Sequence, residues 1–151
     1  RLEVAGLGLG ELELTGLQIV TLASTDWVGV KLLFLRPNQF FPQHRHPPSV
    51  KEGYPGKTEV LRGHYGEAYL YVPGPATQSP KVSPPAHRRQ FCTVWKEISL
   101  LPGQQYICPP NTWHWFQGGE KGGVVWSFST RATDAQDEFQ DPHIVRETVI
   151  V

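Results

Sequence analysis

The chain has 151 residues and a mass of 17.0 kDa, a length that suits one domain. Its 15 glycines and 14 prolines interrupt helices and populate turns, so we expect a compact, mostly β domain. Fourteen basic residues balance fourteen acidic ones, which argues against nucleic acid or an anionic membrane as the main partner.

Short extended segments follow one another along the chain, separated by turns. The strand candidates are 11–15, 18–22, 28–35, 40–46, 58–65, 67–72, 90–96, 97–101, 104–108, 113–116 and 124–129. Gly66 separates a hairpin-like pair, and 118–123 is expected to form a turn between the last two strands. The tail 133–146 fits a helix best, although Pro142 interrupts it. This pattern predicts a single all-β domain, built as a sandwich, jelly roll or barrel.

Two features of the sequence, its apolar patterning and its cysteine count, indicate where in the cell the protein is expected. The sequence has no run of 18 apolar residues and no signal-peptide pattern at its N-terminus, so we expect no membrane partner. Cys92 and Cys108 are too few for a disulfide scaffold and fit a reducing compartment, which predicts a cytoplasmic protein. The sequence holds no methionine, which leaves open that it is a processed or trimmed product with an incomplete N-terminal segment.

Three histidines and a glutamate form the sharpest chemical pattern. His44 and His46 are two residues apart on an expected strand, so both side chains face one side, about 7 Å apart. Glu59 begins a later apolar strand, and His114 lies between two tryptophans. Taken singly, each has an ordinary explanation as a surface pair, a solvated charge or a packed core histidine. Together they form a mixed N/O ligand set that suits Mn, Fe, Co, Ni or Zn better than Ca or Mg.

The spacing around these residues resembles the two cupin motifs. Asn38 lies six residues before His44, and Glu59 lies seven before Gly66. Towards the fourth ligand, residues 103, 109, 111 and 114 (Gly, Pro, Asn, His) follow at intervals of six, two and three. Asn38 and Asn111 stand where the family usually has glycine, and asparagine tolerates the positive φ of such turns. The long spacing from His46 to Glu59 indicates an inserted loop.

The cupin resemblance implies a jelly-roll β-barrel with a short helical or irregular C-terminal tail. The barrel core is expected over about residues 28–130, within a single cupin domain spanning residues 1–151.

Whole segments carry a narrower resemblance, to the D-lyxose ketol-isomerases. These segments are 43–48 (QHRHPP), 55–59 (PGKTE), 69–74 (YLYVPG), 109–117 (PPNTWHWFQ), 128–134 (FSTRATD) and 141–142 (DP). The resemblance implies a homodimer and a divalent metal, commonly Mn²⁺, with Co²⁺, Zn²⁺ or Fe²⁺ as alternatives. It also implies conversion of the monosaccharides D-lyxose and D-xylulose, and of D-mannose and D-fructose. The ligands carried over from the family are His44, His46, Glu59 and His114.

Aldose–ketose conversion through an enediol-type intermediate needs groups that bind sugar oxygens and move protons. Lys31, the sole charge between residues 28 and 35, is expected inside the barrel, against the alternative of an outward lysine that snorkels. Lys57 is placed on the face of Glu59, with exposure at a loop edge as its alternative. Gln117 is expected to contact a sugar hydroxyl.

For the base, a carboxylate is expected. Glu59 could serve, and five acids crowd the tail: Asp134, Asp137, Glu138, Asp141 and Glu147. Among the tail acids we favour Asp137, with Glu138 next. Two other functions stay open at this point: a cupin dioxygenase that uses the same ligands for Fe(II), and a non-catalytic sugar-binding cupin.

Overall fold

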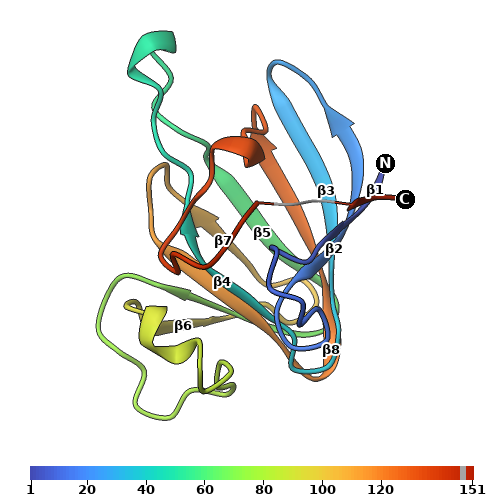
Figure 1. The fold of residues 1–151 in the computed structure, drawn as a ribbon, viewed down its shortest axis with the longest axis vertical. Helices are drawn as coiled ribbons and strands as arrows, with labels where there is room; N and C mark the ends of the chain where they lie inside the picture. Colours follow the sequence, from blue (N-terminus) through green and yellow to red (C-terminus); the bar gives the residue numbers. More distant parts are fainter. Residues whose placement is uncertain (147–148) are drawn as a thin grey trace.

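The computed structural model describes residues 1–146 and 149–151, and in this part of the chain strands dominate (Figure 1). The strands are β1 Leu2–Ala5, β2 Leu17–Ser24, β3 Val28–Leu35, β4 Phe40–Arg45, β5 Glu59–Val72, β6 Lys96–Ser99, β7 Gln105–Cys108, β8 His114–Thr130, β9 Glu138–Phe139 and β10 Val149–Ile150. Three 3-10 turns occur at Val50–Glu52, Arg89–Phe91 and Asp134–Gln136. Among the described helices, none has the length and apolar character needed to cross a membrane.

The two long strands β5 and β8 run through both layers of a jelly-roll fold. The C-terminal half of β8 pairs with β3, whereas its first residues pair with β4. β5 follows the other edge of β8 for its whole length and adds β7 at one end and β6 at the other. The layers therefore read β10-β1-β2-β3-β8-β5-β7 and β9-β4-β8-β5-β6, in a sheet that stays open rather than closing into a full barrel. The prediction of an all-β fold of the jelly-roll type is confirmed.

Two expected turns are instead bends inside continuous strands. At Gly66 (φ 65°) the register between β5 and β8 shifts, so the glycine absorbs an irregularity in a strand of 14 residues. The expected turn at 118–123 is the middle of β8, where glycines allow neighbouring backbone to approach. A Cβ on Gly118 would lie 2.8 Å from the carbonyl oxygen of Arg36. The predicted hairpin and the predicted turn are therefore wrong, because glycine here serves close packing.

Three further segments differ from expectation. Residues 11–15 form a turn, in which the Thr15 N–H donates to the carbonyl of Glu11, not a strand. Within 90–96 a 3-10 turn follows Pro85, whose carbonyl accepts from the Arg89 N–H, and strand structure begins only at residue 96. The tail 133–146 is irregular, with a 3-10 turn and the short β9. Its backbone instead bonds to the barrel, where the Gln140 N–H donates to the Gln43 carbonyl at 3.0 Å.

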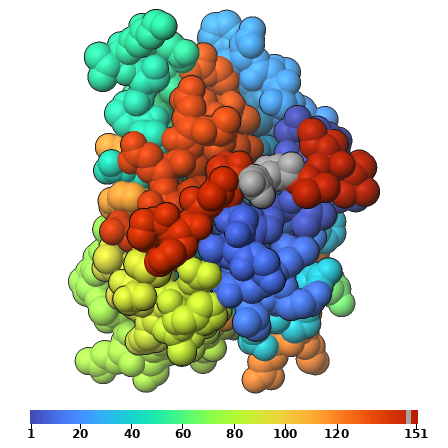
Figure 2. All heavy atoms as spheres, in the orientation of Figure 1, coloured from blue at the N-terminus to red at the C-terminus, as the bar shows by residue number. Residues whose placement is uncertain are grey.

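The tail crosses one face of the molecule. Figure 2 shows it in red-orange, between the blue N-terminal segment and the yellow loop near residue 85. Arg88 in that loop binds both Glu11 (2.9 Å) and the buried Asp141 of the tail (2.8 Å). The hydrophobic core of the molecule includes Leu61, Leu70 and Phe116, whose side chains are almost fully buried. Each such side chain stabilises the fold by about 1.5–3 kcal/mol.

Candidate metal centre

Three histidines meet at one end of the barrel interior. His44 and His46 come from β4 and the residue that follows it, and His114 opens β8 as the cross-strand neighbour of His44. One ligand nitrogen from each ring lies within 4.8 Å of those of the other two. All three side chains are buried. The strand alternation that places residues i and i+2 on one face therefore brings the first pair together, and sheet pairing supplies the third ring.

Each imidazole is oriented by a hydrogen bond at its Nδ1 atom. The acceptors are the carbonyl of Pro42 for His44 (2.9 Å), the carbonyl of Thr112 for His114 (2.8 Å) and Oδ1 of Asp137 for His46 (2.6 Å). A ring that donates from Nδ1 keeps the lone pair of Nε2 for a metal.

Glu59 lies beside this cluster at the start of β5. Its Oε2 atom is 3.1 Å from Nε2 of His46 and 3.9 Å from Nε2 of His114. The hydroxyl of Ser127 donates to the other oxygen, Oε1. Nε2 of His114 is buried and has no hydrogen-bond partner in the described part of the chain. A buried polar atom without a partner destabilises the fold unless a bound ligand satisfies it. The donor set therefore fits a divalent transition metal.

The charge states of these groups suit metal binding. Burial lowers the pKa of His114 to about 4 and holds the pKa of His44 well below its usual value. Burial raises the pKa of Glu59, but the Lys57 ammonium and His46 outweigh it, so the net pKa lies well below the ordinary range. Burial and Lys57 lower the pKa of His46, but its bonds to Asp137 and Glu59 leave it raised. A metal would meet neutral imidazoles on two sides and a carboxylate on another.

A second cluster of charges lies next to the ligands, around Asp134. Lys31 forms an ion pair with Oδ2 of Asp134, and Nζ of Lys57 lies 3.4 Å from its Oδ1. Lys57 also lies 3.6 Å from Glu59. Burial raises the pKa of Asp134, yet the two ammonium groups outweigh it and hold the pKa below its usual range. Burial lowers the pKa of Lys57, but Glu59 and Asp134 leave it above the ordinary value.

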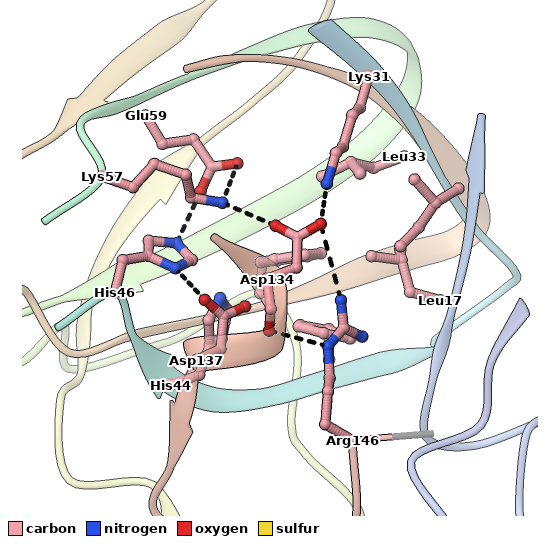
Figure 3. A pocket seen from close by; sticks show the side chains of 13 residues that line it. Leu17, Lys31, Leu33, His44, His46, Lys57, Glu59, Asp134, Asp137 and Arg146 are labelled. Carbon is pink, nitrogen blue, oxygen red and sulfur yellow. Dashed lines mark hydrogen bonds and ion pairs between the residues drawn. The ribbon is translucent and has the colours of Figure 1, made fainter. Parts of the chain in front are cut away.

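Three of the four ligand residues, His44, His46 and Glu59, line one cavity together with the charged residues, and the tail forms part of its wall (Figure 3). The figure shows Asp134 and Asp137 reaching in from the tail, towards Lys31 and His46 respectively. The other walls are apolar, with Leu17, Leu33, Phe41 and Phe116 among them. The free space is about 30 Å³, enough for only one or two waters.

Some of the residues expected at the site line the cavity, whereas others lie away from it. The cavity contains Lys31 and Lys57, both buried, together with Asp137. Glu138 points to the surface and pairs with Arg45 at 2.6 Å.

Gln117 lies elsewhere in the fold. Its amide donates to the carbonyls of Asn38 (2.9 Å) and Ser83 (3.0 Å), and it does not line the cavity. These bonds tie it to two loops away from the cavity, and its contact with a sugar hydroxyl stays a prediction. Glu147 lies outside the described residues.

Three cavity or ligand-contacting residues escaped the sequence reasoning. Asp134 was one of five tail acids, without a feature that set it apart. Arg146, whose Nε donates to the Asp134 carbonyl at 3.3 Å, gave no signal at all. Ser127 could have been found by alternation, since it lies directly across from Lys31 on β8.

Comparison with known proteins places the chain among sugar isomerases. It is 50% identical over 145 residues to a D-lyxose/D-mannose isomerase of Thermosediminibacter oceani, covering 96% of this chain and 79% of that one. It is 44% identical over 151 residues to a D-lyxose ketol-isomerase of a Thermofilum species, covering 100% and 83%. No family model matches the sequence.

Solved structures agree on the fold. An L-ribose isomerase of Cellulomonas parahominis with L-psicose superposes with a TM-score of 0.70 at 18% identity, covering 91% of this chain and 74% of that one. A cupin superfamily protein of Desulfitobacterium hafniense superposes with a TM-score of 0.51 at 12% identity, covering 76% of each chain.

Proposed function

This chain belongs to the D-lyxose ketol-isomerase family, and we propose that it interconverts D-lyxose and D-xylulose and, as a second pair, D-mannose and D-fructose. The reaction type, aldose–ketose isomerisation, follows from the family. The observation that carries the proposal is the buried cluster of three imidazoles and a carboxylate. Two buried lysines share a cavity with His44, His46 and Glu59 of this cluster.

His44, His46, Glu59 and His114 would hold a divalent metal. We propose Mn²⁺ as the native ion, with Co²⁺, Zn²⁺ or Fe²⁺ compatible with the same nitrogen and oxygen donors. Such an ion supplies Lewis-acid stabilisation for the negative charge that develops on the sugar oxygens.

Lys31 and Lys57 provide the polar contacts to the sugar. Both ammonium groups are buried and meet at Asp134, which fixes their positions and compensates their charge. When a sugar oxygen enters, Lys31 can donate to it without leaving the carboxylate, since an ammonium has three N–H donors. This contact stabilises the enediolate oxygen electrostatically.

Asp137 is the proposed base. Among the carboxylates that line the cavity, Glu59 and Asp134 both lie close to lysines, whereas Asp137 forms no ion pair with a lysine or arginine in the described residues. One of its oxygens holds His46, which leaves the other for substrate. It would take the proton from C2 of the aldose and return it to C1, while the O2 proton moves to O1. Glu59 is the alternative for this transfer.

Sugar binding requires movement of the tail 133–146. The free space of about 30 Å³ is far smaller than a five-carbon sugar, and the tail contributes Asp134, Asp137 and Arg146 to the lining of the cavity. Opening would break the ion pair between Lys31 and Asp134, and closure over the sugar would restore the position of Asp137.

We further propose a homodimer located in the cytoplasm. The free, buried state of Cys92 and Cys108 supports a reducing compartment. Dimerisation is expected from the family resemblance.

Ketose formation from a panel of pentoses and hexoses tests the proposed reaction. The protein is stripped of metal and then given Mn²⁺, Co²⁺, Zn²⁺ or Mg²⁺, and the expected result is conversion of D-lyxose that depends on added metal. Oxygen consumption without any sugar conversion would contradict the proposal and favour a dioxygenase.

A further inference from the structure

A second pocket, of about 410 Å³, lies on the other face of the β9-β4-β8-β5-β6 layer from the metal cavity. Phe116 on β8 lines the metal cavity, and the next residue, Gln117, lines the second pocket, because successive side chains of a strand point to opposite faces. The loop of residues 73–95 folds over this face, where the indole N–H of Trp115 donates to the Val94 carbonyl at 2.8 Å. The layer therefore separates the two pockets.

We call this space the loop-side pocket. Its polar lining includes Glu67, Tyr69, Lys81, Ser83, Gln117 and Glu120.

The amide of Gln117 leaves one buried acceptor without a partner at this pocket. Gln117 is 2% exposed, and its Nε2 donates to the carbonyls of Asn38 and Ser83. These two bonds fix the orientation of the amide, because the opposite orientation would place oxygen against two carbonyl oxygens. Oε1 is buried and has no hydrogen-bond partner in the described residues. Since Gln117 and both of its partners line the pocket, a molecule held there can supply the missing donor.

The backbone of β5 directs a carboxylate to the same place. Glu67 falls at a register shift between β5 and β8, where Gly66 and Ala68 have cross-strand partners and Glu67 has none. A bulge of this kind changes the direction of the side chain on the extra residue. Gly119 permits the contact that results, since a Cβ at this position would lie 2.5 Å from Oε2 of Glu67. Two local departures from a regular strand therefore bring this carboxylate to the pocket.

The other groups of the loop-side pocket both donate and accept hydrogen bonds. The carboxylates of Glu67 and Glu120 accept, the ammonium group of Lys81 donates, and the hydroxyls of Tyr69 and Ser83 can do either. Burial, together with the charge of Glu67, raises the pKa of Tyr69, so this hydroxyl keeps its proton. The lining thus carries charges of both signs beside neutral polar groups.

Such a lining favours a neutral polyhydroxyl molecule. Each hydroxyl of a polyol both donates and accepts, so one molecule can satisfy carboxylates, an ammonium group and an amide oxygen together. An anion would meet two carboxylates, a cation would meet the ammonium group, and an apolar molecule would bury these groups without partners. The volume of about 410 Å³ lies within the usual range for small-molecule sites.

We propose that the loop-side pocket binds a neutral polyol or monosaccharide of five or six carbons, with Oε1 of Gln117 and the carboxylate of Glu67 as its main acceptors. This site shares no lining residue with the metal cavity and requires neither a metal nor movement of the tail. The inference goes beyond the proposed function and does not depend on it. The predicted contact of Gln117 with a sugar hydroxyl would be made here and not beside the metal.

Mapping of amide chemical shifts by NMR, with Zn²⁺ added to the full chain and xylitol as the probe, tests the site. Zn²⁺ is diamagnetic, and xylitol has no carbonyl group to isomerise. The signals of Ser83, Gly119 and Glu120 should move and saturate as xylitol is added. In Glu67→Ala the apparent affinity should fall at least about tenfold, the loss expected for one charged hydrogen bond. The matched control is Glu138→Ala, at an exposed glutamate that lines neither pocket, and its affinity should equal that of the wild type.

The absence of saturable shifts at these three residues would overturn the inference, as would an unchanged affinity in both Glu67→Ala and Gln117→Leu. If Gln117→Leu fails to fold, Glu67→Ala decides alone, because Glu67 is exposed. Ethylammonium and Ca²⁺ are titrated in parallel, and shifts with either of them but none with xylitol would refute the polyol as ligand.

Isomerase assays show whether the two sites are independent. Glu67→Ala should convert D-lyxose at the wild-type rate, and a lower rate would contradict the separation of the sites. A wild type that binds xylitol at the loop-side pocket without converting any sugar would refute the proposed reaction and leave this inference intact.

Discussion

Replacing Asp137 by asparagine keeps the shape of the side chain and removes its negative charge. In the structure Oδ1 of Asp137 lies 2.6 Å from Nδ1 of His46, and the two side chains are only 5% and 3% exposed. An amide group can donate to Nδ1 as well as accept from it, and then the ring proton moves to Nε2, the nitrogen that a metal needs. The substitution therefore perturbs the ligand and the proposed base at once.

The two effects have different sizes. Loss of a carboxylate that orients a histidine ligand typically weakens metal affinity about 10- to 100-fold, equivalent to about 1.4–2.7 kcal/mol. Loss of a general base lowers kcat about 10²- to 10⁴-fold. Because excess metal compensates for weaker binding and not for a missing base, the kcat of Asp137→Asn should stay low at saturating Mn²⁺.

Isothermal titration of the metal-free protein with Mn²⁺, together with kcat measured at saturating metal, separates these effects. Glu138→Gln is the matched control, because Glu138 is the next residue and pairs with Arg45 at the surface; its metal affinity and kcat should equal those of the wild type. Wild-type affinity in Asp137→Asn would refute the orienting role. Full turnover restored by excess metal would refute the role as base.

Three further outcomes are expected. His114→Ala should lose metal binding and turnover together, as measured by metal content and ketose formation, and a variant that keeps both is incompatible with the assigned site. Lys31→Ala should retain its metal but lose at least about tenfold in kcat/KM, since one charged hydrogen bond is worth about 1.5–3 kcal/mol. The metal-free protein should lose stability, on the order of a few kcal/mol, as the pH falls from 6.5 to 4 through His114. The folded pKa of His114, about 4, lies below its unfolded value, so the unfolded state gains the proton first. Urea unfolding with a chelator measures this, and a flat profile would contradict it.

The ligand cluster was predictable because its geometry is local. Two-residue periodicity places His44 and His46 on one face, and the motif spacing predicts the turns that return the chain to them. Asn38 and Asn111 adopt φ of 56° and 54°, the left-handed values expected for residues that replace glycine. Such features depend on backbone rules that act within a few residues.

The path of the long strands could not be predicted in the same way. A glycine such as Gly66 is equally compatible with a hairpin turn and with a bulge in a continuous strand. What decides is pairing with β8, where Gly123, the partner of Gly66, lies 57 positions away in sequence. The surroundings of Gln117 were equally hard to predict, since its amide bonds join two loops that sequence reasoning treats separately.

The charge cluster around Asp134 shows why the contacts of the tail could not be predicted from composition alone. The Lys31–Asp134 pair joins residues 103 positions apart, and the Lys57–Asp134 contact spans 77. Burial of Lys31 in an apolar strand is tolerable only with a carboxylate close by, so the sequence of β3 already implied a missing partner without identifying it. The tail supplies that partner, because Asp134 reaches Lys31 from outside the strand. If the tail opens to admit a sugar, the free energy of the Lys31–Asp134 pair opposes the opening and is recovered when the tail closes with Lys31 bound to both the carboxylate and the sugar.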